Sequence, residues 1–141
     1  METITRILIH ADRGEVPIKM DLWEESPNQE KCVAIEAHFD ERIIFAESDV
    51  GFFDALCVIR KELERSELLL RCAGASEDVF PSAMSRGMGL GDHAYRIRMG
   101  ITTKSSDLVW IFSDDVDIIT STLDQQQSFF QRWLESLNVQ R

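Results

Sequence analysis

The part of this chain that most resembles a ligand-binding motif is the stretch 81–100, PSAMSRGMGLGDHAYRIRMG, in which a glycine-rich loop leads into an expected strand. Glycine-rich loops bind phosphate when backbone N–H groups approach the anion at a helix N-terminus. The spacings of the known phosphate loops are absent here and a strand is expected to follow, so the glycines are predicted to shape a turn. Ser82, Ser85 and Arg86 remain a candidate site for an anionic group, which an arginine can bind bidentately.

Two His-x-Asp triplets could each present an imidazole and a carboxylate together, because residues two apart in a strand share a face. The triplets are His10-Ala11-Asp12 and His38-Phe39-Asp40. Four such groups would suffice for zinc if the first and third strands were neighbours. Both triplets lie at strand ends, where polar residues face water, and neither has a recognised ligand spacing. The sequence therefore predicts no metal site and no cofactor.

A hydrolase would need an activated nucleophile, and the sequence contains no complete arrangement of this kind. No serine lies in a G-x-S-x-G pattern. The three cysteines, Cys32, Cys57 and Cys72, are widely spaced among apolar residues, which is typical of buried free thiols in a reducing compartment. These observations lean against an enzyme without excluding one.

Acidic and aromatic residues form a second kind of candidate site. Trp23 directly precedes Glu24 and Glu25, and exposed aromatic side chains among acids suit a protein interface. If the sheet is covered on both faces, Trp23 is instead a core residue, and both interpretations stay open. A second acidic group follows the apolar run 108–112 and comprises Asp114, Asp115 and Asp117. It suits a solvated loop or a contact with a basic partner.

Length and charge restrict the class of protein and its partners. With 141 residues, 44% of them hydrophobic, the chain can form one domain, 1–141, with its own core. Its net charge of −10 disfavours nucleic acid and anionic membranes, which bind proteins through Lys and Arg. The same charge would attract a basic protein partner. No apolar run approaches the ~20 residues of a membrane span and no signal peptide is recognisable, so we expect a cytoplasmic protein.

Hydrophobic periodicity predicts an α+β fold, with a mostly antiparallel sheet of about six to seven strands and two packed helices. The expected strands are 4–9, 16–23, 33–39, 43–46, 68–73, 95–99 and 108–112. The run 108–112 is apolar at every position, which is typical of a central strand covered on both faces. In the strand at 95–99, we expect Tyr95, Ile97 and Met99 to point inward and the two arginines between them outward.

The two helices are expected at about 49–64 and 121–137. Ser48 or Asp49 can cap the first helix. Thr122 and Gln125 resemble a capping box at the start of the second, and Trp133 marks its apolar face.

Part of the glycine-rich loop resembles a group of small uncharacterised bacterial proteins. The residues that carry the resemblance are Val79 to Arg86, then Met88, Gly89, Gly91, Ala94, Tyr95 and Gly100. They follow the group's pattern of hydrophobic–Pro–Ser–small–Met–Ser–Arg, then Met–Gly, Ala–Tyr and a strand that ends in glycine. Such proteins look like orphan or toxin-associated reading frames, so the resemblance implies an immunity-type or partner-binding role. Ala83 and Asp92-His93 depart from the pattern, where glycine and a basic pair are expected.

Two functions are therefore expected. The first is a non-catalytic acidic protein of the immunity type, which binds and blocks a basic bacterial toxin. Its contact residues would be Trp23, Glu24, Glu25, Asp114, Asp115 and Asp117. The alternative is a small-molecule- or anion-binding protein, or an enzyme, that uses the loop from Ser82 to Gly91.

Overall fold

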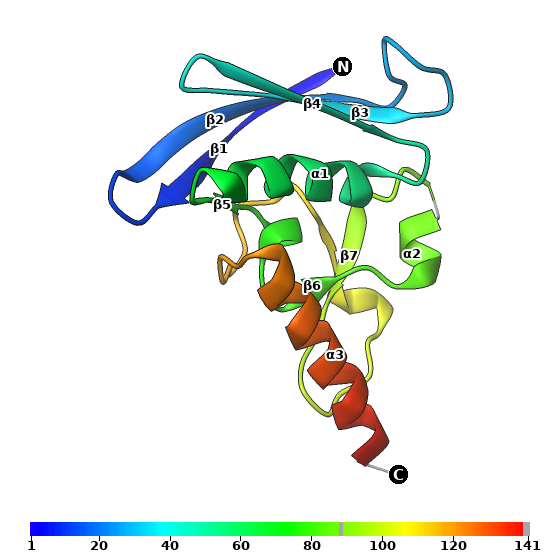
Figure 1. The fold of residues 1–141 in the computed structure, drawn as a ribbon. Coiled ribbons are helices and arrows are strands. Elements are labelled where there is room, and N and C mark those ends of the chain that lie inside the picture. Colours follow the sequence, from blue (N-terminus) through cyan, green and yellow to red (C-terminus); the bar gives the residue numbers. More distant parts are fainter. Residues whose placement is uncertain (88, 140–141) are drawn as a thin grey trace.

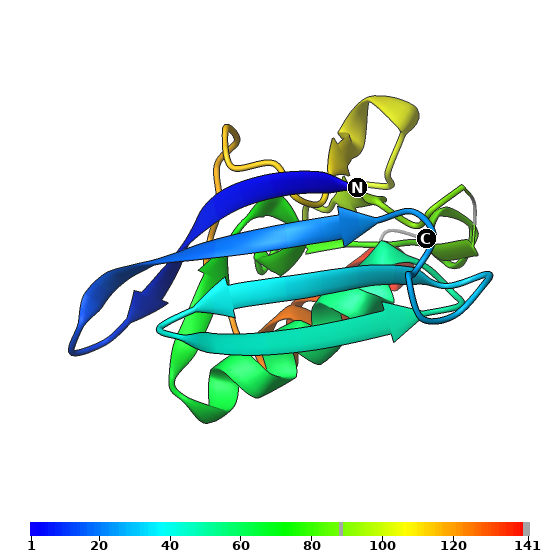
Figure 2. The ribbon, with the colours of Figure 1, turned by 90° about the horizontal axis from the view of Figure 1, so that it is seen from above.

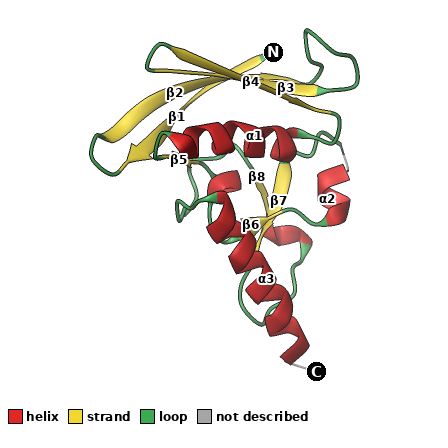
Figure 3. Ribbon diagram, viewed as in Figure 1, coloured by secondary structure: helices red, strands yellow, loops and turns green. Residues whose placement is uncertain are grey.

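A computed structural model describes the backbone of residues 1–87 and 89–139, and the side chains of these residues except 86, 87 and 139. In this part of the chain, strands form two antiparallel sheets and pack with α-helices in an α+β fold (Figures 1 and 3). The α+β class expected from the sequence is confirmed.

The larger sheet has five strands in the order β4-β3-β2-β1-β5. They are β1 (Glu2–His10), β2 (Gly14–Trp23), β3 (Val33–Phe39), β4 (Arg42–Ser48) and β5 (Leu68–Arg71). The smaller sheet has three strands in the order β6-β7-β8. They are β6 (Val79–Phe80), β7 (His93–Arg96) and β8 (Leu108–Trp110). The helices are α1 (Phe52–Arg65), α2 (Ala83–Gly87) and α3 (Leu123–Val139), with short 3₁₀ turns η1 (Ala73–Ala75) and η2 (Ser105–Asp107).

Helix α1 is the central layer of the molecule. The larger sheet lies on one side of it, and the smaller sheet and α3 lie on the other (Figure 1). Alternation along β2 produces the buried face, because Ile18 and Met20 are fully buried while Pro17 and Lys19 between them are exposed. Seen from above, the other face of the larger sheet has no element of the described chain over it (Figure 2). The sheet is therefore covered on one face and open on the other.

A buried arginine joins α1 to the layer formed by the smaller sheet and α3, which we call the lower layer. Arg60 is only 2% exposed, and its Nη1 and Nη2 donate hydrogen bonds to Gln126 Oε1 at 2.6 Å and to the Ser121 carbonyl at 3.0 Å. The Gln126 amide nitrogen in turn donates to the carbonyls of Gly74, Ser76 and Val79, at 2.9, 3.0 and 2.7 Å. Burial lowers the pKa of Arg60, and the surrounding oxygen atoms compensate for the lost hydration of its charge.

The expected central strand at 108–112 is wrong. β8 ends at Trp110 and forms one edge of the smaller sheet, and Leu108 is 37% exposed. Ile111 and Phe112 are almost fully buried but lie in the following turn. A short apolar run shows burial and cannot show whether a strand or a turn delivers it.

The strand after the glycine-rich loop begins and ends earlier than expected, as β7. Ile97 is buried as expected, whereas Met99 is 42% exposed. Arg96 and Arg98 point toward carboxylates, with Arg96 bound to Asp78 at 2.6 Å. The prediction that Met99 points inward is therefore wrong, because the strand has already ended at Arg96.

Helix α1 receives its N-terminal cap from the glycine-rich loop. The backbone N–H groups of Phe52 and Phe53 donate to the carbonyls of Leu90 and Gly91, at 2.8 and 3.0 Å. Ser48 lies further back, where its hydroxyl accepts the N–H groups of the turn that precedes the helix. Side-chain capping by Ser48 or Asp49 is therefore wrong, because Gly51 is the N-cap residue.

The capping box of α3 is confirmed. Thr122 Oγ1 accepts the N–H of Gln125 at 3.1 Å, and Gln125 Oε1 accepts the N–H of Thr122 at 2.9 Å.

The cap of α1 requires glycine at position 51. A Cβ atom there would lie 2.7 Å from the Leu90 carbonyl oxygen and 2.9 Å from the Gly91 Cα. We expect Gly51→Ala to lower the free energy of unfolding by about 1–3 kcal/mol, measured by urea denaturation, because backbone must shift to admit the methyl group. The exposed neighbour supplies the control, and Val50→Ala should change stability by less than about 0.5 kcal/mol. Equal effects of the two substitutions would contradict the packing of the loop on α1.

Candidate functional site

A pocket of about 480 Å³ lies at the start of α1, between the larger sheet and the lower layer. Its walls come from the start of β1, the end of β2 with the loop that follows, the glycine-rich loop, β8 and the turn after β8. The residues that line it are Met1, Glu2, Leu22, Trp23, Glu24, Glu25, Phe52, Leu90, Asp92, Trp110 and Phe112. The pocket thus combines four acidic side chains with four aromatic ones, and we call it the acidic aromatic pocket.

Three aromatic side chains form a rigid wall of the acidic aromatic pocket. The ring of Phe112 packs edge-to-face against both Phe52 and Trp110, with centroid distances of 5.6 Å in each case. Phe52 is held by the cap of α1, and the carbonyl of Phe112 accepts a 2.7 Å hydrogen bond from Arg6 Nε. Phe52 and Phe112 are buried, whereas Trp110 is half-buried. The wall therefore presents mainly the surface of Trp110, which the buried ring of Phe112 supports from behind.

Acidic side chains surround the mouth of this pocket. Glu2, Glu24 and Glu25 are exposed, and within the described part of the chain none of them forms an ion pair. Asp92 has a partner, His93 Nδ1 at 3.0 Å. Unneutralised carboxylates beside aromatic rings favour a cation, because both the charge and the ring faces attract it.

A buried serine positions the loop that carries two of these acids. The backbone N–H of Ser26 donates to the carbonyl of Cys32 at 2.7 Å. Its hydroxyl donates to Glu47 Oε2 at 2.6 Å and accepts the N–H of Asn28 at 3.2 Å. The loop is thereby attached to β4, and Glu24 and Glu25 remain beside the end of β2.

The structure places five of the six predicted partner-binding residues in two separate regions. Trp23, Glu24 and Glu25 lie together in the acidic aromatic pocket. Trp23 is half-buried, so it is neither fully exposed nor a core residue. Asp115 and Asp117 instead line a second, shallow hollow, which shares no residue with this pocket.

Arginines surround the hollow that contains Asp115 and Asp117. Arg96 and Arg98 line it, and the first donates a 2.7 Å hydrogen bond to the carbonyl of Asp117. Asp114 lies apart from both regions, 3.8 Å from Arg6 Nε. The three aspartates therefore have cationic groups of the protein close to them, in contrast to the glutamates of the acidic aromatic pocket.

Residues that the sequence did not connect complete the acidic aromatic pocket. Phe52, Trp110 and Phe112 read as core positions, and neither Glu2 nor Asp92 carries a motif. They come from distant segments, so no spacing in the sequence could have grouped them. The only local signal was the adjacency of Trp23 to the two glutamates that follow it.

The serines of the alternative loop site bind each other's backbone. Ser82 Oγ accepts the N–H of Ser85 at 2.9 Å, and Ser85 Oγ accepts the N–H of Ser82 at 2.8 Å. This is the reciprocal cap of the five-residue helix α2. The side chain of Arg86 lies outside the described residues. The described role of the glycine-rich loop is to supply carbonyl groups to α1, whereas an anion would require N–H groups.

The two His-x-Asp triplets do not come together. β2 lies between β1 and β3, so the first and third strands are not neighbours. His10 Nδ1 accepts N–H groups of Asp12 and Arg13, both at 3.1 Å, and serves the β1–β2 turn. Asp40 binds Arg13 at 2.7 Å.

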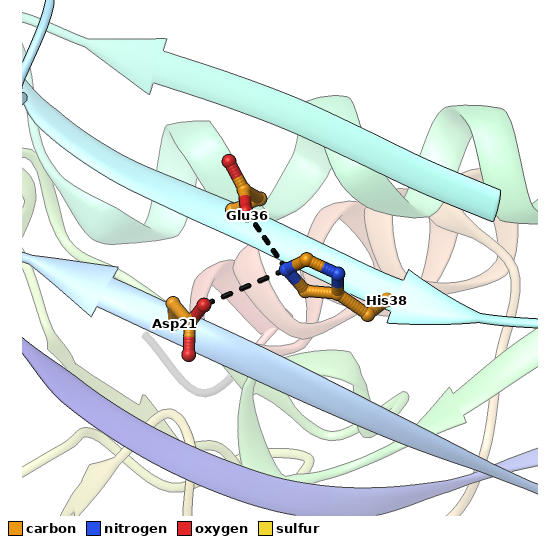
Figure 4. Close-up of side chains that lie close together, drawn as sticks. All are labelled: Asp21, Glu36 and His38. Carbon is orange, nitrogen blue, oxygen red and sulfur yellow. Dashed lines mark ion pairs between the residues drawn. The ribbon is translucent and has the colours of Figure 1, made fainter. Parts of the chain in front are cut away.

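His38 has other acidic neighbours than the sequence suggested. Its Nε2 lies 2.8 Å from Glu36 Oε1 and 3.5 Å from Asp21 Oδ2 on the adjacent strand (Figure 4). The register of β2 with β3 brings these groups together, because it places Asp21 opposite Glu36. This cluster was missed, since alternation along one strand says nothing about its register with the next.

None of the three cysteines forms a disulfide in the described part of the chain. Cys32 and Cys72 are buried as expected, and Cys57 is half-buried. Burial raises the pKa of Cys72 to about 11, so this thiol stays protonated at neutral pH.

Comparison with known proteins adds no relative. Neither a protein-family model nor a curated protein sequence matches the chain. Among the described residues, the helices are too short or too polar to cross a membrane. The functional argument therefore rests on the geometry of the sites.

The role of Ser26 in positioning the acidic loop can be tested directly. We expect Ser26→Ala to lower the free energy of unfolding by about 1–2 kcal/mol in urea denaturation, because Glu47 and the N–H of Asn28 lose a buried partner. Ser128→Ala, on the exposed face of α3, should change stability by less than about 0.5 kcal/mol. If Ser26→Ala were as neutral as this control, the hydroxyl would not hold the loop.

Proposed function

We propose that this protein is a non-catalytic binding protein of the immunity type, and that its acidic aromatic pocket receives a lysine or arginine side chain of a basic partner. In the setting implied by the resemblance, the partner is a bacterial toxin and the complex forms in the cytoplasm. The observation that carries the proposal is the combination of an aromatic wall with glutamates at its mouth that form no ion pair with any described residue.

The chemistry of the pocket suits an extended cationic side chain. The methylene groups of a lysine or arginine can pack on Trp23 and Trp110, which are both half-buried. The charged end of the side chain can reach Glu24 or Glu25. A cation over an aromatic face contributes about 0.5–2 kcal/mol, depending on how far it is desolvated. Arginine gains more than lysine, because its planar guanidinium can stack and bind a carboxylate bidentately.

The overall charge supports the same partner. A net charge of −10 accelerates encounter with a basic protein, and the effect weakens as salt is added. Anchoring by one side chain in a pocket adds specificity to this general attraction, because interface energy concentrates in a few buried aromatic and arginine contacts.

The composition of the pocket favours binding over catalysis. Its described lining residues include no Ser, Cys, His or Lys, and they supply negative charge and aromatic surface. Reaction with a substrate would need an activated nucleophile or a positioned base next to a reacting atom. This composition supports the proposal of a binding protein.

The proposal can be tested with a defined cationic probe and NMR spectroscopy. The chain has three tryptophans, so its indole N–H groups give three assignable signals. We expect an arginine tripeptide to shift the signals of Trp23 and Trp110. The signal of Trp133 should stay in place, because its indole donates a 2.9 Å hydrogen bond to Ile101 far from the pocket. A citrulline tripeptide, of similar shape without the charge, should shift none of them.

Matched charge-neutralising variants separate the pocket from the net charge. Replacing Glu24 and Glu25 together by Gln should weaken tripeptide binding about 5- to 10-fold, since each exposed pair contributes up to about 1 kcal/mol. Replacing Asp115 and Asp117 together by Asn changes the net charge equally and should leave binding within about two-fold. Equal loss in both variants would show non-specific attraction and contradict the proposal, as would unchanged signals of Trp23 and Trp110.

A further inference from the structure

The open face of the larger sheet carries a cluster of three metal-ligating side chains. Asp21 comes from β2, and Glu36 and His38 come from β3, where a spacing of two residues puts them on one face. One ligand atom of each lies within 4.8 Å of the other two. Figure 4 shows the imidazole with Nε2 next to both carboxylates. We propose that this cluster binds a divalent transition-metal ion of the zinc class.

The first support is an unsatisfied nitrogen. His38 Nε2 is buried from solvent and forms no hydrogen bond within the described structure, although Glu36 Oε1 is only 2.8 Å away. At this short distance, the lack of a hydrogen bond means that the oxygen lies off the N–H direction. A protonated imidazole would therefore donate poorly to these carboxylates. A metal ion between the three groups would instead accept the lone pair of Nε2 and neutralise both acids.

The second support is the spacing of the ligand atoms. Zinc binds nitrogen and oxygen at about 2.0–2.2 Å, so two ligand atoms of a tetrahedral site lie about 3.4 Å apart. The distances from Nε2 to the oxygens of Glu36 and Asp21 are 2.8 and 3.5 Å, on either side of this value. Small side-chain rotations can therefore complete the site without movement of the strands.

The surroundings of Asp21 are also those of a metal ligand. The residue is only 8% exposed, and its Oδ1 accepts a 2.7 Å hydrogen bond from the Thr3 hydroxyl on β1. This contact orients the carboxylate and leaves Oδ2 for the cluster, as second-shell hydrogen bonds do in metal sites. No lysine or arginine of the described chain pairs with Asp21 or Glu36, so a bound metal ion would be the cation that neutralises their charges.

The ligand set indicates the class of metal. Imidazole favours zinc and its neighbours over magnesium and calcium, while carboxylates are compatible with both groups. Three protein ligands leave a fourth position for water, on the open face of the larger sheet (Figure 2). The inference is independent of the proposed function, because none of the three residues lines the acidic aromatic pocket.

The probe is zinc chloride, and the direct readout is the ¹⁵N chemical shift of each histidine ring. The chain has three histidines, so every ring nitrogen can be assigned. We expect zinc to move the Nε2 signal of His38 and to leave the rings of His10 and His93 unchanged. Magnesium at the same concentration should move none of them.

Variants measured by calorimetry complete the test. His38→Gln should weaken zinc binding at least 10-fold, and His93→Gln, which removes an exposed histidine beside another aspartate, should leave it unchanged. The wild-type ¹⁵N measurement decides the matter even if His38→Gln fails to fold. An unmoved His38 signal at saturating zinc would overturn the proposal. Zinc affinity that persists in His38→Gln would do the same, since it would place the ion at the cysteines or on exposed acids.

Discussion

The buried guanidinium of Arg60 is the contact on which the arrangement of α1 and the lower layer depends. A charge removed from water costs several kcal/mol unless polar atoms surround it, and here the surrounding atoms come from three separate elements. Gly74 lies in η1, Ser121 precedes α3, and Gln126 lies within α3. The amide of Gln126 is itself held by carbonyls of the segment between η1 and β6. These hydrogen bonds tie the positions of η1 and α3 to α1, so they specify the geometry as well as stabilise it.

The acidic aromatic pocket follows from this arrangement. Phe52 belongs to α1, whereas Trp110 and Phe112 belong to the lower layer, so the edge-to-face contact of Phe52 with Phe112 forms only when α1 and the lower layer are correctly placed. The glycine-rich loop strengthens the same junction, because its carbonyls cap α1 while Leu90 and Asp92 line the pocket. Gly74 shows how closely η1 approaches α1, since a Cβ atom there would lie 3.1 Å from Leu56 Cδ2. The position of the pocket is thus a consequence of how the layers meet.

Local patterns predicted the first half of the fold well. Alternation in the segments at 16–23 and 33–39 corresponds closely to β2 and β3, because one buried face imposes a period of two. The smaller sheet was harder to predict, since β6 and β8 are two and three residues long and depend on tertiary pairing. The same limit applies to the sites. Trp23 and the following glutamates are adjacent in sequence, but the aromatic wall and the contact of Asp21 with His38 depend on packing and register, which a single sequence does not encode locally.

A double-mutant cycle between Arg60 and Gln126 tests the central claim most directly. The free energy of unfolding would be measured in urea for wild type, Arg60→Met, Gln126→Met and the double variant. Each single substitution leaves buried polar groups without partners and should cost about 3 kcal/mol or more. The double variant should cost about 1.5–3 kcal/mol less than the sum of the two single losses, because the two side chains act as one unit. Additive losses, within about 0.5 kcal/mol, would show that the two side chains act independently and that Arg60 does not hold the layers together through Gln126.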